Sequence, residues 1–296
     1  MIFESGMRVD FFVIGAPKCG TTSFCDALAR HPEICFSRPK EPHFFYRTPL
    51  CPAPETNEAY SRECFPHFDP NTHRACGEGT PRILESAEAL DRVLETFPDA
   101  RFLVLVRDPL EMFFSWHGEM LRSFQEDVRD PVKAWRLCGA RREGRRVPAS
   151  CRDPRNLAYD RVCALGSHLD RVMERLDRSR VLVVETERVR TAPGDVLAGT
   201  WRFLGVSAVG PSEISALNTA RALPSETALT WARRLYGWKC RMLGDRPLPF
   251  GLNDRARALL FRRETDRGPS AIPPVEMEAF FEGERERLRS CLSRNG

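Results

Sequence analysis

Short apolar runs without alternating polar residues recur at three places along the chain. They span Asp10–Gly15, Arg101–Val106 and Arg180–Glu185. A strand with one face in water alternates apolar and polar residues, whereas a strand buried on both faces of a parallel sheet does not. The three runs are therefore predicted to be strands inside a parallel sheet.

Helical patterns lie between and after these runs. Asn156–Leu176 and Val196–Leu204 place apolar residues three and four positions apart, which gives a helix one apolar face. Thr22–Arg30 begins among hydroxyl side chains and ends just before His31-Pro32, as helices commonly do. Because strand, helix and strand repeat, we expect an α/β fold, a three-layer domain with a central parallel sheet flanked by helices.

Length and charge narrow the organisation and the partners. At 296 residues the chain is long for one domain and short for two, so we expect a single domain over residues 1–296. A formal net charge of +4 is too small to indicate nucleic-acid binding. We therefore expect no nucleic-acid partner, although a local anion site is compatible with this charge.

Membrane insertion and metal binding are not indicated. The longest apolar run near the start, Phe11–Ala16, is too short for a signal peptide or a membrane span, which favours a cytoplasmic protein. The eleven cysteines are odd in number and include no Cys-x-x-Cys pair, so neither a disulfide framework nor a zinc site is predicted. We expect reduced thiols that pack as small apolar side chains.

Two stretches rich in proline and arginine, Thr48–Pro54 and Arg141–Pro154, are predicted to be long surface loops. The second is either a lid over a substrate or a solvated insertion, and its arginines either bind an anionic acceptor or only solubilise the protein. The charged run Glu282–Arg289 is predicted to be a solvated helix face.

The segment Gly15–Ser23, GAPKCGTTS, follows a predicted strand and precedes a predicted helix. At such a junction, backbone N–H groups and the helix N-terminus bind phosphate, which makes the predicted sheet a P-loop-type domain. The alternative is that the hydroxyl residues only cap the helix.

The lysine of this loop is displaced. In nucleoside triphosphatases a lysine follows the second glycine and the next Ser or Thr holds Mg²⁺, but here Thr21 follows Gly20 and the lysine is Lys18. A lysine inside the loop suits a donor with a single 5′-phosphosulfate, where it would stabilise charge on the leaving oxygen. We therefore expect metal-independent chemistry with Lys18 as a catalytic residue.

The loop resembles the 5′-phosphosulfate loop of the sulfotransferases that use 3′-phosphoadenosine 5′-phosphosulfate (PAPS). The resemblance implies that PAPS is the co-substrate, that 3′-phosphoadenosine 5′-phosphate (PAP) is the product, and that the donor is bound by Lys18, Cys19, Gly20, Thr21, Thr22 and Ser23.

A second motif supports the same donor. Arg107-Asp108-Pro109 follows the predicted strand Arg101–Val106, and Ser115 lies eight residues after the arginine. In the resembling family an arginine and a serine so placed bind the 3′-phosphate, and a guanidinium and a hydroxyl suit that anion. Alone, Arg-Asp-Pro is more often a salt-bridged turn.

The segment Lys40–Phe45, KEPHFF, resembles a stretch of the heparan sulfate sulfotransferases and their bacterial relatives in which the glutamate is the catalytic base. An acceptor hydroxyl must lose a proton as it attacks sulfur. Glu41 is the first candidate and His43 the second. The alternative is structural: Glu41 pairs with a neighbouring cation and His43 packs in the core. His117 is a weaker candidate, since it points about 200° away from Ser115 on a helix.

The segment Gly77–Pro81 departs from this branch. The heparan sulfate branch has a lysine before Thr-Pro, where this chain has Gly79. The departure removes one cation near the sulfate and argues against strict heparan sulfate specificity. Lys40 is the nearest basic residue in sequence that could replace it.

These observations predict a sulfotransferase that acts on a hydroxyl of a carbohydrate or small-molecule acceptor. Donor motifs occupy residues 10–120, and the acceptor loops are expected at Thr48–Arg62 and within 141–296. Two alternatives remain, a P-loop small-molecule kinase and a non-catalytic nucleotide-binding relative. The sequence does not indicate the oligomeric state.

Overall fold

The computed structural model describes residues 8–49, 53–215 and 274–293. The chain divides into two compact units, the first made of residues 1–109, 164–218 and 282–296, the second of 110–163 and 219–281. The expectation of one sulfotransferase domain over the whole chain stays a prediction.

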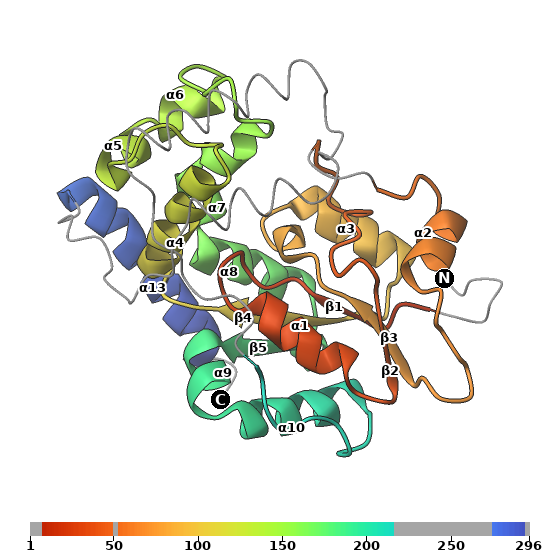
Figure 1. Cartoon of the computed structure of the whole chain (residues 1–296). Coiled ribbons are helices and arrows are strands. Elements are labelled where there is room, and N and C mark those ends of the chain that lie inside the picture. Colours follow the sequence, from red (N-terminus) through yellow and green to blue (C-terminus); the bar gives the residue numbers. More distant parts are fainter. Residues whose placement is uncertain (1–7, 50–52, 216–273, 294–296) are drawn as a thin grey trace. The chain divides into compact units, whose positions relative to one another are not determined.

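The first unit is built on a five-stranded parallel sheet with the order β2-β3-β1-β4-β5 (Figure 1). Its strands are β1 (Phe11–Val13), β2 (Ile34–Phe36), β3 (Ala75–Glu78), β4 (Arg101–Val106) and β5 (Val181–Glu185). The longest pairing joins β4 to β5, from Phe102 opposite Val181 to Val106 opposite Glu185. The predicted strands are confirmed as β1, β4 and β5, whereas β2 and β3 were not predicted.

Helices cover both faces of this sheet. Helix α1 (Thr21–Ala29) leads from β1 to β2, and α3 (Ala87–Thr96) leads from β3 to β4. These connections run in opposite directions along the sheet, so right-handed crossovers place α1 and α3 on opposite faces (Figure 1). The predicted α/β architecture is confirmed.

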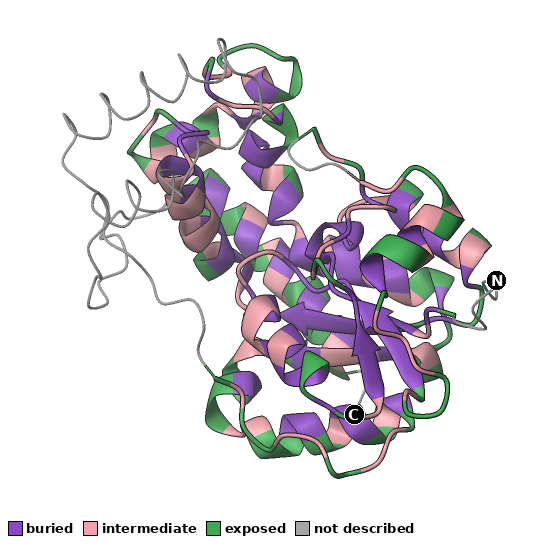
Figure 2. Cartoon of the chain, turned by 45° about the vertical axis from the view of Figure 1, so that its right-hand side comes forward, coloured by how far each residue is buried: buried purple, intermediate pink, exposed green. Residues whose placement is uncertain are grey.

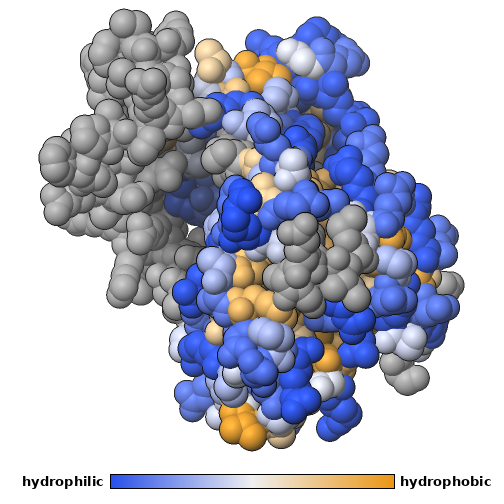
Figure 3. All heavy atoms as spheres, turned by 90° about the vertical axis from the view of Figure 1, so that its right-hand side faces the viewer, coloured by the Kyte–Doolittle hydropathy of each residue, from blue (hydrophilic) through white to orange (hydrophobic). Residues whose placement is uncertain are grey.

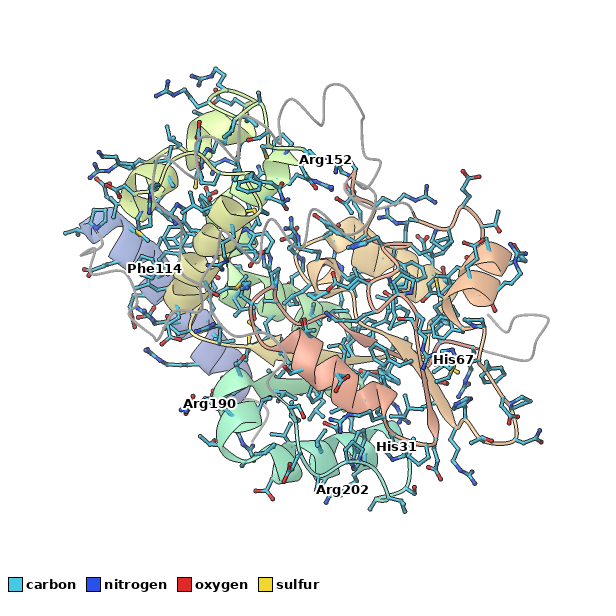
Figure 4. All side chains as sticks on the ribbon, viewed as in Figure 1. His31, His67, Phe114, Arg152, Arg190 and Arg202 are labelled. Atoms are coloured by element: carbon cyan, nitrogen blue, oxygen red, sulfur yellow. The ribbon has the colours of Figure 1, made fainter. Side chains whose placement is uncertain are left out.

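Two later helices complete the layers. Helix α8 (Leu165–Arg175) joins the face of α3, where Arg175 pairs with Asp91 at 3.3 Å. Helix α10 (Pro193–Leu204) joins the face of α1, where the rings of His31 and Trp201 lie 4.6 Å apart. Figure 4 labels His31 and, on α10, Arg202. The first unit also contains α2 (Asn57–Cys64) and α9 (Thr186–Thr191).

The core lies in and beside the sheet. All residues of β1 to β3 and all but the first of β4 are buried (Figure 2). On the face drawn in Figure 3 hydrophilic residues predominate and hydrophobic ones are scattered among them. No disulfide forms among the described cysteines. All of these but Cys151 are buried, in agreement with the prediction that they pack as small apolar side chains.

The second unit holds helices. Among its described residues these include α4 (Pro109–Arg122, of which Pro109 belongs to the first unit), α5 (Pro131–Arg136), α6 (Cys138–Arg142), α7 (Tyr159–Val162) and the start of the last described helix. Arg141, at the start of the predicted solvated loop Arg141–Pro154, is instead buried on α6. Its guanidinium donates to both carboxylate oxygens of Glu126 at 2.6 and 2.7 Å, and the Tyr159 hydroxyl donates to the same carboxylate. Arg141 is therefore structural, and the prediction of a free surface arginine there is wrong.

Helix α13 (Val275–Ser293) contains the charged run 282–289. The prediction of a fully solvated face is wrong at Glu284, whose side chain is buried. Its carboxylate accepts from the backbone N–H of Ser167 at 2.8 Å and from the Ser167 hydroxyl at 2.6 Å. Glu284 therefore ties the C-terminal half of α13, which belongs to the first unit, to α8. No described helix is both long and apolar enough to cross a membrane.

Candidate active site

The parallel sheet brings the predicted functional segments together. Because all five strands run in one direction, their carboxyl ends meet at one edge. Lys18 follows β1, Lys40 follows β2, Gly79 follows β3 and Arg107 follows β4. Connections leave this edge in opposite directions from β1 and β3, and ligands of open α/β sheets bind at such a point.

The loop after β1 has the backbone of an anion-binding turn. Lys18 and Gly20 both have positive φ angles, 65° and 79°, and α1 begins at the next residue, Thr21. Alternating backbone conformations of this kind turn successive N–H groups toward one point, and the helix N-terminus adds its partial positive charge. Gly20 stands at the N-cap, so no side chain there covers the first N–H groups of α1.

Two neighbouring strand ends hold this loop in place. The Arg107 guanidinium donates to the carbonyl of Lys18 at 3.1 Å, and the Thr186 hydroxyl donates to the carbonyl of Cys19 at 2.9 Å. Both carbonyls thereby have donors within the protein. Burial raises the pKa of the Cys19 thiol to about 12, although the Arg107 charge lowers it, so the thiol stays protonated at pH 7.

The loop after β2 places the candidate base beside this anion site. The Lys40 ammonium lies 2.7 Å from Oε1 of Glu41 and 3.4 Å from the hydroxyl of Thr21. His43 places Nε2 3.8 Å from the other carboxylate oxygen of Glu41. Four predicted site residues, Lys18, Thr21, Glu41 and His43, thus belong to two adjoining loops joined by Lys40.

The core fixes the segment that carries Glu41 and His43. The ring of Phe44 stacks on Tyr60 at 4.7 Å, and Phe45 meets Phe12 of β1 edge-on at 5.6 Å. Arg92 donates to the Phe45 carbonyl at 3.1 Å. The two phenylalanines of the KEPHFF segment therefore hold the loop, and the two polar residues before them remain half-buried.

His43 and Glu41 differ in their surroundings. Burial lowers the pKa of His43, with a smaller opposing effect from the charge of Glu41, so the imidazole is neutral at pH 7. The Glu41 side chain is 36% exposed and the His43 side chain 12%. A substrate hydroxyl therefore reaches Glu41 more easily.

Gly79 leaves space that Lys40 occupies. A Cβ atom built on Gly79 would lie 3.3 Å from Cε of Lys40 and 2.6 Å from Sγ of Cys25. The Gly79 N–H also donates to the Lys40 carbonyl at 3.0 Å. Where the heparan sulfate branch has a lysine, this chain has Gly79, and the side chain of Lys40 from the loop after β2 lies next to it.

Glu78 is a buried carboxyl beneath the site that the sequence did not indicate. It is 0% exposed, and the Tyr60 hydroxyl donates to Oε2 at 3.0 Å. Burial raises the pKa of Glu78 to about 8; the hydrogen bond from Tyr60 reduces the rise and the charge of Glu41 adds to it. The available signal was a single carboxylate among small residues in Gly77–Pro81.

Ser115 and His117 lie on α4, in the second unit. His117 is 4% exposed and its Nε2 lies 2.9 Å from the carbonyl of Val128, and burial lowers its pKa. This places His117 in the helical core, in agreement with its low rank as a candidate. The predicted role of Ser115 at the 3′-phosphate stays a prediction.

Comparison with known proteins assigns the family. The model of the sulfotransferase domain matches residues 8–221. The chain belongs to the sulfotransferase family. This match confirms the family predicted from the loop after β1 and the KEPHFF segment.

Two human relatives show how far the likeness of this sulfotransferase-family chain extends. It is 25% identical over 205 residues to bifunctional heparan sulfate N-deacetylase/N-sulfotransferase 3, and this alignment covers 66% of the chain and 22% of the relative. It is 57% identical over 37 residues to carbohydrate sulfotransferase 15, or 12% of the chain and 7% of the relative. The chain thus spans about a fifth of the length of the first relative.

A solved structure has the same fold. The sulfotransferase from Alicyclobacillus acidocaldarius superposes with a TM-score of 0.60 at 24% identity, covering 82% of this chain and 98% of the other. The predicted P-loop-type fold is confirmed by this likeness.

The buried Glu78 carboxyl predicts a pH-dependent stability. The folded chain keeps its proton up to about pH 8, whereas the unfolded chain loses it near the ordinary value of 4.5. The stabilisation is therefore complete below pH 4.5 and is lost as the pH rises toward 8. Glu78→Gln should remove this loss, which amounts to a few kcal/mol at about 1.4 kcal/mol per pKa unit.

Urea unfolding at intervals from pH 5 to 8 measures the difference between wild type and Glu78→Gln. The same substitution at Glu95, which is exposed on α3, is the matched control and should keep the wild-type slope. Parallel pH profiles for wild type and Glu78→Gln would show that Glu78 is ionised in the folded protein.

Proposed function

We propose that the chain transfers a sulfuryl group from PAPS to a hydroxyl of a carbohydrate or small-molecule acceptor, releasing PAP. The observation that carries this proposal is the contact of one lysine, Lys40, with both the phosphate-type loop at Thr21 and the candidate base Glu41. An anion-binding loop and a carboxylate held side by side are the two parts that such a transfer requires.

The donor side would use the loop after β1. Backbone N–H groups of Gly20 to Ser23 and the Lys18 ammonium would bind the 5′-phosphosulfate. The N–H of Cys19, which was predicted to join them, donates to the Ala16 carbonyl at 3.3 Å instead. By the second motif, Arg107 and Ser115 would bind the 3′-phosphate, since a guanidinium and a hydroxyl both donate to that anion. The Arg107 guanidinium also donates to the Lys18 carbonyl at 3.1 Å, which ties it to the loop after β1.

The transfer is an in-line displacement. The acceptor oxygen forms a bond to sulfur while the bond from sulfur to the bridging oxygen breaks, and the electron pair of that bond stays on the 5′-phosphate of PAP. The acceptor proton passes to Glu41. Negative charge grows on the bridging oxygen, where Lys18 and the loop amides stabilise it.

Glu41 is the preferred base and His43 the second candidate. Glu41 is the more exposed of the two, and its carboxylate forms an ion pair with Lys40 at 2.7 Å. His43 is neutral and 3.8 Å away, so it either orients the carboxylate or accepts the proton itself.

A kinase is the weaker proposal. It would need an acidic residue at a strand end to hold Mg²⁺, and Asp108 after β4 is the best placed by sequence. The Asp108 carboxylate is instead paired with Arg285 of α13 at 2.5 Å. A carboxylate already neutralised by arginine is a poor metal ligand.

The acceptor class is inferred from the relatives and from composition. Both human relatives carry heparan sulfate or carbohydrate in their names, which favours a sugar acceptor. The name of the first relative specifies N-sulfation, so the choice of a hydroxyl rests on the sequence prediction and not on the relatives. The small net charge of +4 gives no reason to expect nucleic acid. We also propose, from the sequence, that the protein is cytoplasmic and that its activity needs no metal.

PAP should stabilise the protein specifically. A ligand that binds only the folded state increases the free energy of unfolding, by about 2.7 kcal/mol at a concentration of 100 times Kd. The melting temperature rises accordingly. Thermal melting with PAP, with ATP plus Mg²⁺ and with neither measures this. Lys18→Ala should reduce the protection by PAP, and equal protection by ATP plus Mg²⁺ would favour a kinase.

Removing the base should slow transfer without weakening donor binding. Glu41→Gln keeps the shape of the side chain but takes no proton, so kcat should fall about 10²- to 10⁴-fold. Protection by PAP should stay within error of wild type, because PAP has no reacting group at Glu41. A Glu41→Gln enzyme of normal rate, paired with an inactive His43→Gln enzyme, would assign the base to His43.

A further inference from the structure

Lys40 and Gly79 fit one another sterically. Lys40 reaches the site from the loop after β2, and Gly79 follows β3 on the neighbouring strand. The Gly79 N–H donates to the Lys40 carbonyl at 3.0 Å, which joins the two segments at their backbones. A Cβ atom at position 79 would lie 2.6 Å from Sγ of Cys25, 3.2 Å from Cζ of Phe36 and 3.3 Å from Cε of Lys40. The end of the lysine side chain therefore packs directly against the glycine, and a larger residue there would press on it.

We propose that Lys40 is a catalytic cation that binds the sulfuryl oxygens during transfer, and that glycine at position 79 gives it room. This inference rests on the proposed function. It assigns a positive charge to the acceptor side of the sulfur atom, in addition to that of Lys18 on the donor side.

The contacts of the ammonium define its position. It lies 2.7 Å from the carboxylate of Glu41 and 3.4 Å from the hydroxyl of Thr21, the first residue of α1. A sulfuryl group passes from the loop that precedes α1 to an oxygen activated by Glu41. A cation that contacts both Thr21 on the donor side and Glu41 on the acceptor side lies beside the sulfuryl group during its transfer. An ammonium has three N–H donors, so a third is available for a sulfuryl oxygen.

The exposure of Lys40 agrees with a role toward a ligand. Its side chain is 23% exposed and that of Glu41 36%, so solvent and substrate reach the pair. Ion pairs at such exposure contribute little to stability. A structural ion pair therefore explains less of this arrangement than a charge kept for the transferred group.

The step in which Lys40 acts moves no proton to or from it. The bond from sulfur to the acceptor oxygen forms, the bond to the bridging oxygen breaks, and the acceptor proton goes to Glu41. Lys40 keeps its charge and stabilises the negative charge on the sulfuryl oxygens. Removing one such stabilising group typically costs about 10²- to 10³-fold in kcat.

Lys40→Met tests the charge at nearly constant volume. We expect kcat to fall about 10²-fold or more, with the protection by PAP unchanged because PAP lacks the sulfuryl group. Lys40→Arg, which restores the charge, should recover at least part of the rate. Unchanged PAP protection also shows that Lys40→Met is folded, and Lys40→Gln is the second variant should the methionine variant fail to fold.

Moving the positive charge from position 40 to position 79 tests whether the two positions reach the same place in the site. In the Lys40→Met background, Gly79→Lys returns a cation from the opposite segment, with Cys25→Ala added to remove the sulfur that a Cβ at position 79 would strike. We expect this triple variant to be at least about tenfold faster than its counterpart with Gly79→Met, the matched control without the charge.

The outcomes separate this inference from the function on which it rests. An inactive wild-type protein that PAP does not protect contradicts the proposed function, and the role of Lys40 with it. An active wild type with Lys40→Met within threefold of its kcat overturns the inference about Lys40 alone. A Lys40→Met variant that loses PAP protection while folded also overturns it, because Lys40 would then act in donor binding.

Discussion

The site depends on one constraint, the parallel pairing of five strands with their carboxyl ends at a single edge. This pairing brings Lys18, Glu41 and Arg107 into one unit although 89 residues separate the first from the last. No pattern confined to neighbouring residues in the sequence could show that these three residues meet. The same pairing lets Arg107 and Thr186 donate to the carbonyls of Lys18 and Cys19, which fixes the loop after β1 at the start of α1.

Buried polar groups support the half-exposed ones. Tyr60 stacks on Phe44 and donates to Glu78, so one side chain joins the segment that carries Glu41 to the end of β3. Beside it, the Tyr46 hydroxyl donates to Glu85 at 2.8 Å and accepts from Arg82 at 3.0 Å. A network of this kind restricts the motion of the loop above it, and a base needs a fixed position to act.

The sequence predicted the parts of the fold whose signals are local. Uninterrupted apolar runs identified β1, β4 and β5. No such run marks β2, which has only three apolar residues between polar neighbours, or β3, whose sequence ACGE contains a glycine and a glutamate. Arg141 was predicted on the surface because nothing near it in sequence shows that Glu126 will bury it. Lys18 and Glu41 came from motifs, but the meeting of Lys40, Thr21 and Gly79 depends on strand order, which the sequence does not display.

The proposed function requires that the loop after β1 bind the phosphosulfate end of PAPS next to Glu41. An experimental structure of the protein with PAP is the decisive test. We expect the 5′-phosphate within hydrogen-bond distance of the Lys18 ammonium and the N–H groups at the start of α1, the 3′-phosphate on Arg107, and Glu41 facing the 5′ end. PAP bound away from this loop, or with its 5′ end turned away from Glu41, would rule out this arrangement of donor and base.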